Sequence, residues 1–103
     1  ETPHMTLKEV LDLKILHENF AIEVRKKNSN DPDEYNNMHK TENGWVKQYT
    51  KTKILNRPIT IEDVLSARET RTKETLPKDC LDWEICSIYG ANPYKLIIKL
   101  QEK

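Results

Sequence analysis

The chain has 103 residues, which is enough for one domain and too few for two of ordinary size. Apolar residues make up 36% of the chain and charged residues 33%, so we expect a small core and a strongly hydrated surface. The 17 basic and 17 acidic side chains balance, which argues against the basic field of a non-specific nucleic-acid binder.

The start of the chain and its cysteines indicate the compartment. Residues 1–4 resemble an expression-vector remnant, Met5 is expected to be the natural start, and no signal-peptide pattern is present. No apolar run approaches the roughly 18–20 residues that span a membrane. If Cys80 and Cys86 share one strand, their Cα atoms lie about 20 Å apart, too far for a disulfide. Two unpaired thiols favour a reducing compartment, so we expect the cytoplasm.

A helix is predicted over residues 6–14. Thr6 can cap its free backbone amides, and Glu9 can reach back to the Thr6 amide, which is the pattern of a capping box. Apolar residues then follow at helical spacing: Leu7, Val10 and Leu11. Beyond the helix the apolar period changes to two, which predicts a strand over 20–26.

The middle of the chain is polar. Residues 27–43 are rich in Asn, Asp and Ser and are predicted to form a long loop. Aromatic and β-branched residues predict a strand over 45–54, and a second capping box at Thr60 predicts a helix over 60–68. Residues 69–79 are predicted to form another long polar loop.

Two strands, over 81–89 and 95–100, are expected to form an antiparallel hairpin around the turn at residues 90–93. The predicted fold class is therefore α+β, with a small antiparallel sheet of about four strands and two short helices. A single domain over residues 5–103 accounts for all of these elements.

The first candidate site is one face of the strand over 45–54, where aromatic and cationic side chains alternate: Trp45, Lys47, Tyr49, Lys51 and Lys53. Stacking platforms flanked by cations hold single-stranded nucleic acid. Arg68 and Arg71 extend this locally basic region. The alternative is that the aromatic residues cover the edge of the core while the lysines protect an exposed strand from aggregation.

The second candidate is the acidic group Asp31, Asp33 and Glu34 in the first polar loop. A calcium loop needs regular ligand spacing, a glycine at the bend and a closing glutamate, and this loop has Pro32 and no glycine before Gly44. We therefore expect solvated carboxylates, which could still address a basic surface on a partner as a mimic of nucleic-acid phosphate.

Catalysis and metal binding are not expected. No local signature of a nucleophile surrounds either cysteine, and His17 and His39 do not lie at zinc-ligand spacing from them. Gly44 and Gly90 are the only glycines, so a glycine-rich phosphate loop is excluded. We predict no cofactor and no enzymatic activity.

Both ends of the chain resemble short phage and prophage proteins of Gram-positive bacteria. The opening run Met5-Thr6-Leu7-Lys8-Glu9-Val10-Leu11-Asp12-Leu13 is similar to their start, and Leu81–Tyr89 followed by Leu96–Leu100 is similar to their terminal hairpin. The resemblance implies a small α+β scaffold of mobile-element origin and no catalytic residues. The long middle, residues 27–79, departs from the short form. Proteins of this origin often block a host factor, and anti-CRISPR proteins are the best-known class.

The resulting hypothesis is a non-enzymatic, phage-encoded binding protein that blocks a host protein, such as a CRISPR nuclease, in the bacterial cytoplasm. The alternative is an accessory protein that binds single-stranded nucleic acid through the aromatic and lysine face. A homodimer formed through the strand over 45–54 is also open, although its lysines resemble protection against such pairing.

Overall fold

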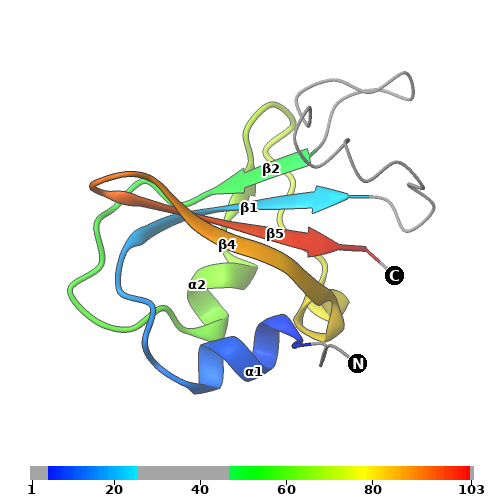
Figure 1. Cartoon of the computed structure of the whole chain (residues 1–103). Helices are drawn as coiled ribbons and strands as arrows, with labels where there is room; N and C mark the ends of the chain where they lie inside the picture. The colour runs from blue at the N-terminus through cyan, green and yellow to red at the C-terminus, as the bar shows by residue number, and fades with distance from the viewer. Residues whose placement is uncertain (1–4, 26–46, 103) are drawn as a thin grey trace.

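The computed structural model describes residues 5–25 and 47–102, and Figure 1 shows a five-stranded sheet with its helices on one side. The elements in chain order are α1 (Leu7–Asp12), β1 (Asn19–Arg25), β2 (Lys47–Thr50), α2 (Ile61–Leu65), β3 (Arg68–Glu69), the 3₁₀ turn η2 (Lys78–Asp82), β4 (Glu84–Asn92) and β5 (Lys95–Gln101). The predicted α+β class is confirmed. The predicted loop over 27–43 lies outside the described residues.

The sheet has the strand order β3-β2-β1-β5-β4, with one strand more than expected. It is also mixed rather than antiparallel throughout, because β1 and β5 are parallel neighbours at its centre, with Asn19 opposite Lys95 and Arg25 opposite Gln101. The other three strand pairs are antiparallel. The predicted hairpin is present in β4 and β5, and its turn falls after Asn92 instead of at residues 90–93.

Both helices begin with the predicted capping boxes. The Glu9 amide donates to Thr6 Oγ1 at 3.3 Å, and the Thr6 amide donates to Glu9 Oε1 at 3.3 Å. The Asp63 amide donates to Thr60 Oγ1 at 3.2 Å, and the Thr60 amide donates to Asp63 Oδ2 at 2.9 Å. Four amides that the helices themselves cannot pair are satisfied in this way.

Both helices end earlier than predicted. After α1, Lys14 adopts a positive φ of 56°, which directs the chain out of the helix. After α2, the Ser66 hydroxyl donates to the Asp63 carbonyl at 3.0 Å and takes up one of the terminal carbonyls. Two residues later the chain enters β3, so the predicted extension to residue 68 does not form.

Two predicted strands are shorter or displaced. Within the described residues, β2 stops at Thr50, and residues 51–60 form the connection to α2 instead of continuing the strand. The strand predicted over 81–89 begins only at Glu84, because Leu81 and Asp82 still belong to η2, which also contains Cys80. The assumption that both cysteines share one strand is therefore wrong, although both remain thiols.

The unexpected strand β3 spans the last residue of the predicted helix and the first residue of the predicted second polar loop. Glu69 lies opposite Tyr49 of β2 and is buried. Its carboxylate accepts hydrogen bonds from the Arg71 and Thr72 amides, which close a turn where Lys73 has a φ of 65°. A buried glutamate that pairs with backbone amides therefore places a strand in a sequence with almost no apolar residues.

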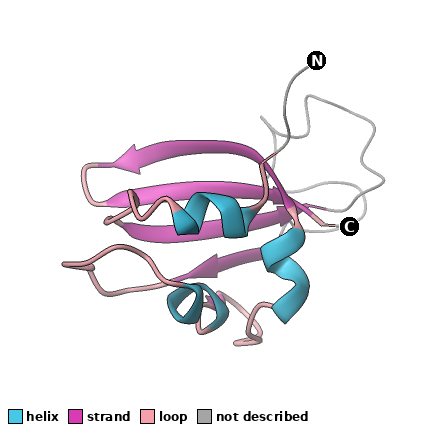
Figure 2. Ribbon diagram, turned by 90° about the horizontal axis from the view of Figure 1, so that it is seen from below, coloured by secondary structure: helices cyan, strands magenta, loops and turns pink. Residues whose placement is uncertain are grey.

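The core lies between one face of the sheet and the helices, as Figure 2 shows from the helical side. Its buried members are Leu7, Leu11, Phe20, Ile22, Val24, Tyr49, Ile59, Val64, Ala67, Leu76, Cys80, Trp83, Ile98 and Leu100. Strands supply alternate residues and the helices supply one stripe each, as amphipathic elements do when they pack on one another. No helix in the described part of the chain is long and apolar enough to cross a membrane.

Candidate protein-binding surface

The predicted aromatic and lysine face is not assembled as expected. Tyr49 is only 3% exposed and lies in the core, and burial, together with the nearby charges of Glu74 and Glu69, raises the pKa of its hydroxyl. A buried ring cannot stack on a nucleic-acid base. Trp45 lies outside the described residues, and Lys47 is exposed at the start of β2.

The other two lysines of that predicted face lie beyond the end of β2. Lys51 Nζ donates to Ser66 Oγ at 2.8 Å and so connects the start of the β2–α2 connection to the end of α2. Lys53 is exposed in the same connection. Because β2 ends at Thr50, the alternation that would have kept these lysines beside Tyr49 does not extend to them.

The two candidate arginines contact their own hairpin. Arg68 donates to the Lys73 carbonyl at 3.4 Å, and Arg71 Nε lies 3.8 Å from Glu69 Oε1. Both side chains are exposed. The acidic candidates lie outside the described residues: Asp31, Asp33 and Glu34.

Among the described residues, Cys80, Cys86 and His17 form no pair with one another in the contacts that the structure gives, and His39 lies outside these residues. Cys80 is fully buried, and burial, with the charges of Asp79 and Asp82, raises the pKa of its thiol to about 11. A thiol with that pKa is a poor nucleophile. The His17 ring lies 3.3 Å from the Ile15 carbonyl. Among residues 5–25 and 47–102, no group of three His, Cys, Asp or Glu side chains could hold a metal ion.

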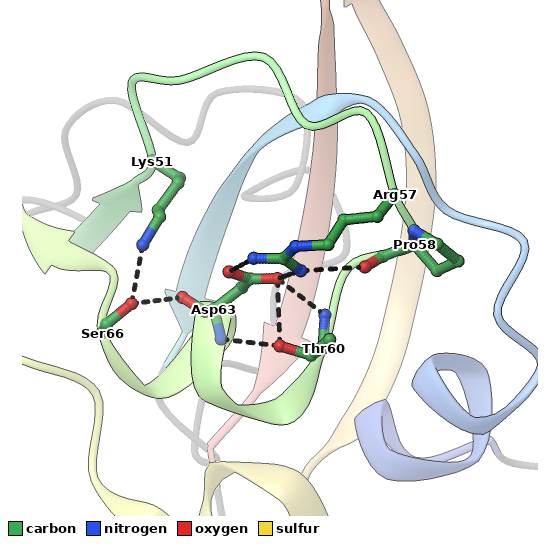
Figure 3. Close-up of polar contacts among 6 residues, drawn as sticks. All are labelled: Lys51, Arg57, Pro58, Thr60, Asp63 and Ser66. Carbon is green, nitrogen blue, oxygen red and sulfur yellow. Dashed lines mark hydrogen bonds and ion pairs between the residues drawn. The ribbon is translucent and has the colours of Figure 1, made fainter.

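A polar cluster supports the start of α2 (Figure 3). Arg57 donates to both carboxylate oxygens of Asp63, at 2.6 and 2.9 Å, and also to the Pro58 carbonyl at 3.2 Å. The hydrogen bonds from Arg57 and from Thr60 outweigh the burial of Asp63 and hold its pKa well below the usual range. The cluster fixes the β2–α2 connection to the helix, which is a structural role.

A second group of polar side chains lies on the face of the sheet opposite the helices. Glu23 and Lys99 occupy neighbouring positions on β1 and β5, and the Lys99 ammonium lies 5.1 Å from the centre of the Tyr89 ring. Burial and the Glu23 charge raise the pKa of Tyr89. Glu23 and Lys99 are only 6% and 5% exposed, so these two charged side chains offer little accessible surface to a ligand.

Several large apolar residues are exposed in the connections between helices and strands. Four large hydrophobic side chains are between 54% and 65% exposed, and we call them the apolar end: Leu13, Ile15, Ile54 and Tyr94. They lie in the α1–β1, β2–α2 and β4–β5 connections. All three connections lie at the same end of the sheet, where β1 and β5 begin and β2 and β4 finish (Figure 1).

Backbone contacts hold these connections in place. The Ile59 amide donates to the Leu16 carbonyl at 2.7 Å, which joins the α1–β1 connection to the β2–α2 connection. The Lys51 amide donates to the Phe20 carbonyl at 3.2 Å. The Arg57–Asp63 ion pair then anchors the far side of the same connection. The two connections that carry Leu13, Ile15 and Ile54 are therefore held in place by hydrogen bonds and an ion pair.

Basic residues flank the apolar residues of two of these connections in the sequence. Lys14 and Lys53 are exposed beside Ile15 and Ile54 in the sequence, and Lys51 and Arg57 lie in the same connection as Ile54. Apolar residues in a charged surround are typical of a surface that another protein covers. The sequence analysis predicted a highly charged surface. It placed Leu13 in a helix and Ile54 in a strand, and so did not identify either residue as part of a binding surface.

Comparisons of the chain with protein-family models, with curated proteins and with solved structures gave no significant match.

Proposed function

We propose that this protein is a non-enzymatic binding protein that attaches to another protein through the apolar end. The observation that carries the proposal is that Leu13, Ile15, Ile54 and Tyr94, each more than half exposed, lie in three connections at one end of the sheet. Isolated exposed apolar residues are normal on a soluble surface, whereas a group of them on neighbouring loops is typical of an interaction site.

The surrounding charges specify the chemistry of the partner surface. Lys14 and Lys53 are next to Ile15 and Ile54 in the sequence, and Glu18 is the one acidic residue in the three connections. A partner with apolar pockets inside an acidic rim would complement this surface, and the charges would also favour a fast and specific encounter. The partner that fits is therefore an acidic protein surface.

The resemblance of both chain ends to phage proteins directs the choice of partner. The proposal is that the protein is phage- or mobile-element-encoded and blocks a bacterial defence effector such as a CRISPR nuclease. Nuclease sites carry carboxylates that hold divalent metal ions, and a basic, apolar surface could cover such a site. The two reduced thiols fit a cytoplasmic location in the host.

The test combines binding with inhibition. Purified CRISPR nucleases of a Gram-positive host are titrated with the protein, and complex formation and DNA cleavage are both measured. We expect a stoichiometric complex with one of them and loss of cleavage at equal molar amounts. Ile54→Asp and Ile15→Asp should each raise the dissociation constant by about tenfold or more, because each buries a charge in an apolar contact.

The matched control is Lys78→Asp, which changes charge in η2, at the opposite end of the molecule (Figure 1). It should leave binding unchanged, and circular dichroism should show that all three variants keep their fold. Inhibition that survives both isoleucine substitutions would remove the apolar end from the proposal. Salt-sensitive binding of a labelled oligonucleotide that the same substitutions weaken would replace the protein partner with nucleic acid.

A further inference from the structure

The remaining exposed hydrophobic residues lie along the outer strand of the sheet. Apart from the apolar end, the large hydrophobic side chains that are exposed in the described part of the chain are Met5, Ile88 and Tyr89. Ile88 and Tyr89, each 38% exposed, are neighbours in β4, and the Met5 carbonyl accepts a hydrogen bond from the Ile85 amide of the same strand. This second group is separate from the apolar end.

Strand β4 forms one edge of the sheet. The outer side of its first residues is covered. Thr6 forms an antiparallel bridge with Glu84, and the Ile85 amide donates a hydrogen bond to the Met5 carbonyl at 2.8 Å. From Ser87 to Asn92, no strand among the described residues pairs with its outer side. That stretch therefore presents backbone donors and acceptors, at every second residue, to whatever lies beside it.

Two usual protections of an edge strand, charged residues and proline, are missing from this stretch. Ser87-Ile88-Tyr89-Gly90-Ala91-Asn92 contains no charged residue and no proline. Natural proteins normally place lysine, proline or a covering element at such an edge to prevent pairing with another chain. Irregularities in the β4–β5 ladder lie between Ile85 and Ser87 and between Gly90 and Asn92, and the segment Ser87–Gly90 between them is regular.

The opposite edge of the sheet cannot serve as the complement. Strand β3 has only two residues, and its outer side is occupied by its own hairpin: the Glu69 amide donates to the Glu74 carbonyl at 2.7 Å, and Arg68 bridges to Thr75. Head-to-tail pairing of β4 with β3 of another molecule is therefore blocked. Pairing of β4 with β4 remains, and it closes after two copies.

We propose that the β4 strands of two copies of this chain pair antiparallel across a two-fold axis near Ile88 and Tyr89, forming a symmetric dimer with a continuous ten-stranded sheet. No like charges meet in this arrangement, because the segment is uncharged. If Ile88 lies on the axis it faces its own copy and Ser87 faces Tyr89; if Tyr89 lies there, two aromatic rings face each other. Either register covers both exposed apolar residues.

The first experiment measures mass in solution. Light scattering coupled to size-exclusion chromatography of the full chain, from low to high micromolar concentration, should approach twice the chain mass of 12.2 kDa. Ile88→Lys should raise the dimer dissociation constant by about tenfold or more, because in either register it places two cations at or next to the axis. A single-chain mass at every concentration, or a dimer that survives Ile88→Lys, would overturn the proposal.

The control is Ile54→Lys, which introduces the same charge at the apolar end. It should leave the dimer intact while it alters partner binding, so failure of the dimer and failure of the proposed function can be told apart. Dissociation by Ile54→Lys as well as by Ile88→Lys would show a non-specific charge effect and count against the strand pairing.

The second experiment locates the axis. Ile88→Cys and Tyr89→Cys are each combined with Cys86→Ser and oxidised. Directly opposite residues of an antiparallel pair have Cα atoms about 4.5–5.5 Å apart, within the range of a disulfide, so the residue on the axis should cross-link to itself. Ile15→Cys in the same background should remain monomeric on a non-reducing gel. Absence of cross-linking at both β4 positions would exclude the pairing.

Discussion

Asp63 combines three structural tasks in one buried side chain. Its carboxylate accepts from the guanidinium of Arg57 and from the amide and hydroxyl of Thr60, while its own amide binds the Thr60 hydroxyl. It thereby caps α2, places a negative charge at the start of the helix and fixes the preceding loop. The Asp63 carboxyl group makes these contributions to stability in full only while it is ionised.

Replacement of Asp63 by Asn should change how stability depends on pH. The pKa of Asp63 is lowered in the folded state, so its contribution is complete above the unfolded pKa of about 3.9 and is lost as the pH falls below that value. Urea denaturation between pH 7 and pH 2 should therefore show a steeper loss for the native chain than for Asp63→Asn. Parallel curves for the two proteins would contradict this assignment, and Asp82→Asn, at an exposed position, serves as the control.

The helix starts show which part of the structure was predictable. A capping box depends on residues three apart, so Thr6 with Glu9 and Thr60 with Asp63 could be recognised without any knowledge of the rest of the chain. Arg57 could not be recognised, because its contact with Asp63 depends on the path of the loop between them.

Strand β3 illustrates the opposite case. Its two residues are charged, and Glu69 is buried only because the amides of Arg71 and Thr72 supply its hydrogen bonds and β2 supplies its neighbour. Neither partner is visible in a hydrophobic pattern. The apolar end was missed for a related reason, since exposure of Leu13 and Ile54 follows from where α1 and β2 stop.

Replacement of Glu69 by Ala should loosen the β3 hairpin. Burial raises the pKa of Glu69, but the hydrogen bonds from Thr72 and Arg71 outweigh it and the pKa is lowered overall, so the side chain is an ionised acceptor. Its loss leaves two turn amides without their acceptor and should cost about 1–3 kcal/mol. Amide hydrogen exchange should increase first in residues 69–75. Glu74→Ala, at an exposed position in the same hairpin, should have little effect.

Equal sensitivity of the two glutamate variants would show that the hairpin depends on its net charge and not on the buried carboxylate. Exchange that rises uniformly over the whole sheet, with no local increase, would show that β3 opens only when the entire domain unfolds. Either result would contradict the role given to Glu69.

The two thiols report on the integrity of the whole domain. Cys86 is exposed in β4, whereas Cys80 is buried in the core and has a pKa raised to about 11. Ellman's reagent should modify one thiol per chain in native buffer and the second only as the domain unfolds, because the reagent needs an accessible thiolate. Cys86→Ser should remove the rapid phase alone. Rapid reaction of two thiols in the native protein would contradict the packing around Cys80.

The parallel pairing of β1 with β5 has a consequence for how the molecule forms. The central pair of the sheet joins residues 19–25 to residues 95–101, so the strands that hold the core together are supplied by distant parts of the chain. Contacts of such long sequence separation require a large loop to close before they gain any stability, which slows folding. During synthesis β1 has no parallel neighbour until β5 is made, which is after almost all of this chain has been synthesised.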